Sequence, residues 1–106
     1  MGDLPRHKLS DADIQDALKS LPGWTVKNGK LHREYQFEDF VNAFGFMASV
    51  ALVAESMSHH PEWSNVYNTV GFDLWTHSIP GISNLDAALA GKVEALAKGA
   101  GARSPG

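Results

Sequence analysis

The most constraining feature of this sequence is a stretch of fifteen residues without a charged side chain, from Phe40 to Ala54. Apolar residues recur in and just beyond it at helical spacing, which predicts one helix over about residues 38–58. At 100° per residue they form two stripes about 110° apart. One stripe holds Phe40, Phe44, Met47, Ala51 and Ala54, and the other holds Phe46, Val50, Val53 and Met57. One stripe can cover a sheet, whereas the second needs another partner, so we expect the chain to form oligomers.

The same stretch is too short and too mixed for a membrane span, which needs about 20 apolar residues. It contains Asn42, Gly45 and Ser49, so we interpret it as a buried helix. The first eight residues lack the basic and then apolar pattern of a secretory signal, and we expect a cytoplasmic protein without membrane contact.

Composition narrows the class of function further. The 106 residues carry a formal charge of -3, which argues against non-specific binding to nucleic acid. There is no cysteine, which excludes disulfides, thiolate metal sites, iron–sulfur clusters and cysteine nucleophiles. Five histidines are many for a chain of this length. Because cysteine chemistry is excluded, the histidines are the first candidates for functional residues.

The remaining local signals predict two more helices and two hairpins. Ser10 and Asp13 resemble a capping box, and Asn28-Gly29 is a strong hairpin turn. The order helix, hairpin, helix, hairpin, helix predicts an α+β fold with a four-stranded antiparallel sheet and three helices packed on one face. The expected segments are a helix ending before Pro22, strands at 24–26, 31–37, 63–67 and 70–76, and a last helix at 85–98 after Ser83. Residues 1–98 would form a single domain, and the glycine-rich tail 99–106 is expected to be disordered.

The second hairpin allows a prediction of register. With a two-residue turn at Asn68-Thr69, the residue numbers of each opposed pair add up to 137. Trp63 then lies opposite Leu74 and, by extension, His60 lies opposite His77. Because Asn-Thr is a weaker turn than Asn-Gly, a slip of one or two residues stays open. In each case the exit of the long helix, with His59 and His60, meets the end of the last strand.

Four interpretations of this histidine cluster follow from the residues. His59 and His60 can complement the negative end of a helix dipole. Three histidines with Glu55 can bind zinc, although the HExxH spacing is absent. Imidazoles can act as acid and base near neutral pH without a metal. The cluster can also form a protein-binding surface with Trp63, Tyr67 and Trp75.

Two carboxylates are candidates for support of the cluster. Glu55 lies four residues before His59, so it can orient an imidazole if the helix continues, or it can be an ordinary exposed side chain. Asp86 stands three residues after Ser83, a spacing that favours a helix cap.

These residues resemble the pterin-4a-carbinolamine dehydratase family. The spaced signature consists of Glu55, His59, His60, Pro61, Tyr67, His77 and Asp86, and the stretches AFGFM (43–47) and HHPEWSNVYN (59–68) are similar to typical family segments. The resemblance covers about residues 9–97. It implies the same α+β fold, and a homodimer or homotetramer.

The resemblance also implies the reaction. Family members dehydrate 4a-hydroxytetrahydropterin, a carbinolamine, to quinonoid dihydropterin in tetrahydrobiopterin recycling, without metal or bound cofactor. By this resemblance His59 is the principal acid–base residue, His60 holds the substrate and His77 is the second proton-transfer group. The other implied site residues are Ser58, Trp75, Thr76 and Ser78 around the pterin, with Glu55 and Asp86 in support.

Two positions depart from the animal members that the chain resembles, since Ser58 stands where Asp is usual and Ser78 where Glu or a similar residue is usual. The resemblance further implies an alternative role as a protein-binding module, either a dimerisation cofactor of a transcription factor or an assembly chaperone. Retention of His59, His60 and His77 favours the enzyme.

Overall fold

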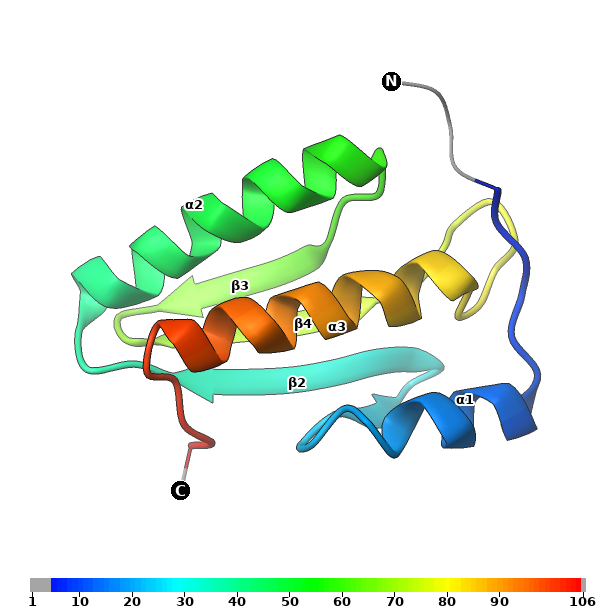
Figure 1. Cartoon of the computed structure of the whole chain (residues 1–106), viewed down its shortest axis with the longest axis horizontal. Coiled ribbons are helices and arrows are strands. Elements are labelled where there is room, and N and C mark those ends of the chain that lie inside the picture. Colours follow the sequence, from blue (N-terminus) through cyan, green and yellow to red (C-terminus); the bar gives the residue numbers. More distant parts are fainter. Residues whose placement is uncertain (1–4, 106) are drawn as a thin grey trace.

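The computed structural model describes residues 5–105 and has the predicted order of elements (Figure 1). Three helices lie on one face of a four-stranded antiparallel sheet whose strand order is β1-β2-β4-β3. The elements are α1 (Asp11–Leu18), β1 (Thr25–Lys27), β2 (Lys30–Gln36), α2 (Phe40–Met57), β3 (Glu62–Val66), β4 (Thr69–Leu74) and α3 (Asn84–Gly99). The predicted α+β fold is therefore confirmed, and the strand order adds that β2 and β4 form the centre of the sheet.

Local chemistry explains where the first elements begin and turn. Ser10 and Asp13 form the predicted capping box at the start of α1. Asn28 and Gly29 both have positive φ, at 53° and 75°, as the two central residues of a type I′ turn require. Lys27 then pairs with Lys30, which confirms the predicted first hairpin.

Helix α2 buries most of one apolar stripe and leaves the large side chains at the start of the other exposed. Phe46, Val50 and Met57 face the sheet in the core, whereas Phe40 and Phe44 of the other stripe are about half exposed. By length and composition alone α2 could also cross a membrane, a test that core helices of soluble proteins pass as well. That another subunit covers this exposed stripe stays a prediction.

The register of the second hairpin differs from the predicted one by two residues. Trp63 pairs with Phe72 and Val66 with Thr69, so opposed residues sum to 135 and the turn residues are Tyr67 and Asn68. Three contacts fix this turn, since Asn65 donates to the carbonyls of Tyr67 and Thr69, and Asn68 donates to that of Phe37. The prediction that His60 opposes His77 was therefore wrong; the observed register, extended beyond the paired residues, sets His60 opposite Trp75.

The end of the chain contacts the sheet. Because β1 pairs only with the first residues of β2, the far end of β2 has a free edge, and the backbone of Gln36 makes two hydrogen bonds of 2.7 and 2.9 Å with Arg103. Gly101, with φ of 74°, turns the chain toward this edge after α3. These contacts differ from the disordered tail expected over residues 99–106, and Gly106 itself lies outside the described residues.

A polar cluster is buried between the sheet and α3. The hydroxyl of Tyr35 donates to Glu94 at 2.5 Å, and the indole of Trp24 donates to both groups. Burial raises the pKa of Tyr35 well above its usual value, and the hydrogen bond to Glu94 raises it further.

This pKa shift predicts a loss of stability in alkali. Below pH 10 folded and unfolded chains both hold the Tyr35 proton, but above it the unfolded chain releases the proton first. The free energy of unfolding should then fall by up to about 1.4 kcal/mol per pH unit from this group. Urea unfolding between pH 8 and 11 measures the effect. Tyr35→Phe should remove it and Tyr67→Phe, at the exposed tyrosine, should retain it; equal pH slopes in the two variants would contradict this origin.

Candidate functional site

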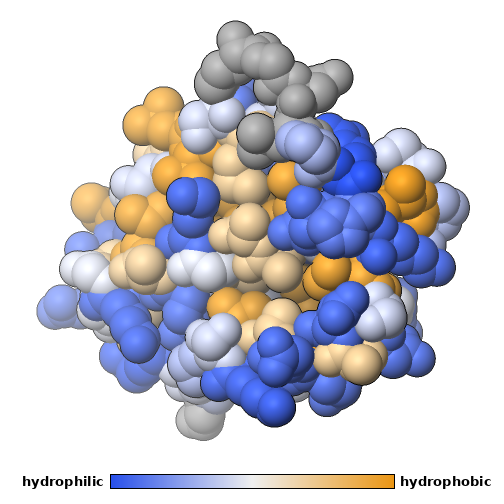
Figure 2. Space-filling model, turned by 45° about the vertical axis from the view of Figure 1, so that its right-hand side comes forward, coloured by the Kyte–Doolittle hydropathy of each residue, from blue (hydrophilic) through white to orange (hydrophobic). Residues whose placement is uncertain are grey.

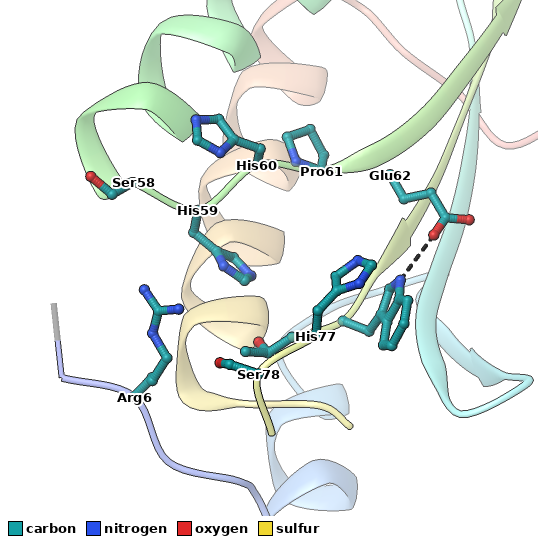
Figure 3. Close-up of a pocket in the computed structure, with 10 residues that line it drawn as sticks. Arg6, Ser58, His59, His60, Pro61, Glu62, His77 and Ser78 are labelled. Atoms are coloured by element: carbon teal, nitrogen blue, oxygen red, sulfur yellow. Dashed lines mark hydrogen bonds between the residues drawn. The ribbon is translucent and has the colours of Figure 1, made fainter. Parts of the chain in front are cut away.

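A cavity of about 590 Å³ lies where α2, the end of β4 and the segment before α1 meet (Figure 3). Its lining residues are Arg6, Ser58, His59, His60, Pro61, Glu62, Trp75, Thr76, His77 and Ser78. All seven residues predicted to bind substrate are among them. Figure 2 turns this end of the molecule forward and shows hydrophilic and apolar residues interspersed rather than one large apolar area. The surroundings therefore suit a small polar ligand.

The end of α2 separates the two adjacent histidines. Ser58 adopts a left-handed conformation with φ of 51°, and the N–H of His59 donates to the carbonyl of Ala54, as in a Schellman motif. The chain thus reverses direction within one residue. His59 turns inward and is 7% exposed, whereas His60 lies on the surface. The rings point in different directions, as Figure 3 shows.

His59 is held by a buried carboxylate. Its Nε2 lies 2.6 Å from Oδ1 of Asp86, and the Asp86 side chain is fully buried. Because a carboxylate only accepts hydrogen bonds, Nε2 of His59 carries the proton and donates. The other ring nitrogen, Nδ1, is then left to accept or give a proton in the cavity.

Asp86 joins the cap of α3 to the site. Its Oδ2 accepts from the backbone N–H of Ser83 at 2.8 Å, in the predicted capping box, and from the hydroxyl of Thr76 at 2.9 Å. Asp86 therefore serves both roles weighed from the sequence. The Thr76 hydroxyl also bonds to the Ser83 hydroxyl at 2.7 Å, and its backbone pairs with Gly81. These partners use the polar groups of Thr76 within the protein, so this residue positions Asp86 instead of presenting a free hydroxyl to a ligand.

The other two histidines have different partners. Nε2 of His60 lies 2.9 Å from Oε1 of Glu55, with both side chains exposed. Glu55 thus orients His60, and not His59 as its helical spacing suggested, because the helix ends between them. His77 stacks on Trp75 with ring centroids 3.8 Å apart and an interplanar angle of 34°.

Polar contacts with Glu62 and Lys30 hold Trp75 in place at the wall of the cavity. Its indole N–H donates to Glu62 at 2.9 Å, and Lys30 bonds to the same carboxylate at 3.2 Å while lying over the Trp75 ring. The hydrogen bond from Trp75 and then that from Lys30 lower the pKa of Glu62. Glu62 is therefore a carboxylate near neutral pH, and it fixes the wall on which His77 stacks.

The structure does not bring together the three histidines and Glu55 that could have bound zinc. Among residues 5–105 no three His, Asp or Glu side chains are gathered closely enough to hold a metal ion. His59 is paired with Asp86, and His60 with Glu55. The candidate ligands around the cavity therefore form two separate histidine–carboxylate pairs instead of one ligand set.

Two lining residues, Arg6 and Glu62, were not recognised in the sequence as part of the site. Arg6 comes from the segment before α1, about 70 residues before its neighbours around His77 in the sequence. Only a contact between distant segments brings it here, and no local spacing indicates such a contact. Glu62, by contrast, stands two residues after His60, and the hairpin that was predicted carries it toward Trp75.

Comparison with known proteins agrees with this arrangement. The family model described as pterin 4 alpha carbinolamine dehydratase matches residues 7–96. The chain belongs to the pterin-4a-carbinolamine dehydratase family. A relative from Solibacter usitatus, for which pterin-4-alpha-carbinolamine dehydratase is a provisional name, is 59% identical over 92 residues, which cover 87% of this chain and 97% of that protein.

Other pterin-4a-carbinolamine dehydratase relatives extend the comparison. A Prochlorococcus marinus protein with the same provisional name is 47% identical over 91 residues, which cover 86% of this chain and 95% of that protein. A crystal structure from Brucella melitensis, described as a transcriptional coactivator/pterin dehydratase, superposes with a TM-score of 0.82 at 44% identity, over 86% of this chain and 99% of that one. Family and fold thus agree along most of the chain.

Proposed function

We propose that the protein dehydrates a 4a-hydroxytetrahydropterin to the quinonoid dihydropterin by proton transfer from histidines. The observation that carries the proposal is the buried pair of His59 and Asp86 at a cavity that His77 also lines. The family assignment supports a pterin as the substrate, and the histidine side chains can transfer protons.

The reaction needs one acid and one base. The C4a–oxygen bond breaks as the hydroxyl group gains a proton and leaves as water, and the ring nitrogen beside C4a loses its proton as the C=N double bond forms. No oxidant or reductant is required. General acid–base catalysis of this kind contributes about 10²- to 10⁴-fold to a rate.

The surroundings of the histidines support a division of these roles. His59 is the base, because the Asp86 carboxylate stabilises the imidazolium that forms when Nδ1 takes the ring-nitrogen proton. His77 is the acid, since its ring is held at the cavity by stacking on Trp75 and its exposure lets water restore the proton. His60, turned toward Glu55, borders the substrate and holds it.

The proposal is tested by the rate of dehydration. A pterin-dependent aromatic hydroxylase generates 4a-hydroxytetrahydropterin in the assay, and its decay is followed by ultraviolet absorbance. The purified protein should accelerate the decay in proportion to its concentration. A decay equal to the spontaneous one at every protein concentration would contradict the proposal.

The Brucella melitensis structure is described as a coactivator as well as a dehydratase, which favours a protein-binding role as the second candidate. The exposed stripe of α2, with Phe40 and Phe44, offers an apolar surface away from the histidines. For that role, a specific protein partner should still bind a variant that lacks His59, His60 and His77. Loss of binding in that variant would count against a separate binding surface.

A further inference from the structure

Arg6 gives the described lining of the cavity its one permanent positive charge. Of the ten described residues that line the cavity, Arg6 is the only lysine or arginine. Within residues 5–105 the only arginine–carboxylate ion pair joins Arg33 and Glu94, in the core. Arg6 is exposed, and the five N–H donors of its guanidinium match the oxygens of a carboxylate or phosphate.

The backbone around Arg6 is fixed to α3 by Asn84. The Asn84 side chain donates to the carbonyl of Pro5 at 3.0 Å and accepts from the N–H of His7 at 2.7 Å. The backbone N–H of Asn84 also donates to the carbonyl of His7 at 3.1 Å, and Leu9 bonds to Ile82. Arg6 is thus held from both sides at the cavity by the first residue of α3. The contacts of Pro5 and His7 with Asn84 therefore set the position of Arg6.

The positive and negative side chains that line the cavity lie on different sides of it. In Figure 3 Arg6 lies near Ser58 and Ser78 on one side of His59, whereas Glu62 lies on the other side, beyond His77. The chain as a whole has a formal charge of -3, so attraction for an anion here is local. An anionic group on a bound ring is attracted toward Arg6, whereas the charge of Glu62 is already paired with that of Lys30, so Arg6 orients the ring in the cavity.

We propose that Arg6 forms an anion subsite that selects pterins whose ring substituent carries a carboxylate or phosphate group. The inference rests on the proposed function, and it specifies the class of substrate for the same site. The volume of about 590 Å³ is within the range of pockets that bury whole small ligands, so the cavity has room for a substituent as well as the ring. Arg6 is then a specificity-determining residue, while His59 and His77 move the protons.

Two pterins that differ in the charge of one substituent test this inference. Pterin-6-carboxylate is the anionic probe and 6-hydroxymethylpterin the neutral one, and the fluorescence of the pterin ring measures each Kd. The wild-type protein should bind the carboxylate about tenfold more tightly, as expected for a charge-assisted hydrogen bond at a partly exposed site. Arg6→Gln should abolish that preference and leave the Kd of 6-hydroxymethylpterin unchanged. Asn84→Ala, which releases the segment around Arg6, should reduce the preference.

A matched control separates local from overall charge. Arg103→Gln removes one positive charge at the other end of the chain, outside the cavity, and should leave both Kd values unchanged. Equal Kd values for the two probes, unaffected by Arg6→Gln, would overturn the anion subsite and leave the dehydratase proposal standing. Failure of both probes to bind the wild-type protein would overturn the proposed function and this inference together.

Discussion

Replacing His59 with glutamine should slow dehydration by about 10²-fold or more, because a side-chain amide can donate to Asp86 but cannot transfer a proton. The buried carboxylate keeps a partner in this variant, so the fold should be retained. Decay of 4a-hydroxytetrahydropterin gives the rate, and circular dichroism with urea unfolding gives the state of the fold.

His32→Gln is the matched control for this variant. His32 is also paired with an aspartate, since its Nδ1 lies 2.9 Å from Oδ1 of Asp73, but it lies on β2 and does not line the cavity. The control should dehydrate the pterin at the wild-type rate. An unchanged rate in His59→Gln would remove His59 from the proposed mechanism, whatever the control does.

Replacing Asp86 with alanine should lower the free energy of unfolding by about 3–5 kcal/mol, the usual loss when a buried, hydrogen-bonded charge pair is broken. His59, the Thr76 hydroxyl and the Ser83 N–H all lose their acceptor at once. Urea unfolding at neutral pH measures the loss.

The second histidine–aspartate pair again provides the comparison. Asp73 is 37% exposed and bonds to His32 at the sheet surface, so Asp73→Ala should cost less than about 1 kcal/mol. The two variants remove the same group from pairs that differ in burial. Equal losses in both would show that burial does not set the contribution of Asp86.

Much of the fold could be predicted because its signals are local. Ser10 with Asp13, Ser83 with Asp86, and Asn28-Gly29 each act within four residues, and all three formed as expected. The register of the second hairpin could not be predicted, since it depends on Asn68 donating to Phe37, which lies 31 residues away in sequence. An error of two residues preserved the faces of the strand, so Val70, Phe72 and Leu74 still point into the core as predicted.

The site was predicted in part for the same reason. The family signature placed His59, His60 and His77 around one cavity. The pairing of His59 with Asp86 spans 27 residues, and the pairing of His60 with Glu55 depends on how α2 ends. Arg6 was missed because its position depends on Asn84, at the other end of the chain.

The double use of Asp86 has an evolutionary consequence. Its carboxylate caps α3 and anchors Thr76 as well as holding His59, so selection for a folded chain preserves it even where catalysis is no longer needed. His77, exposed at the cavity, has no comparable structural role among the contacts described. If the proposed function holds, a descendant that became a binding protein alone should lose His77 first and keep Asp86, as a trace of its catalytic ancestor.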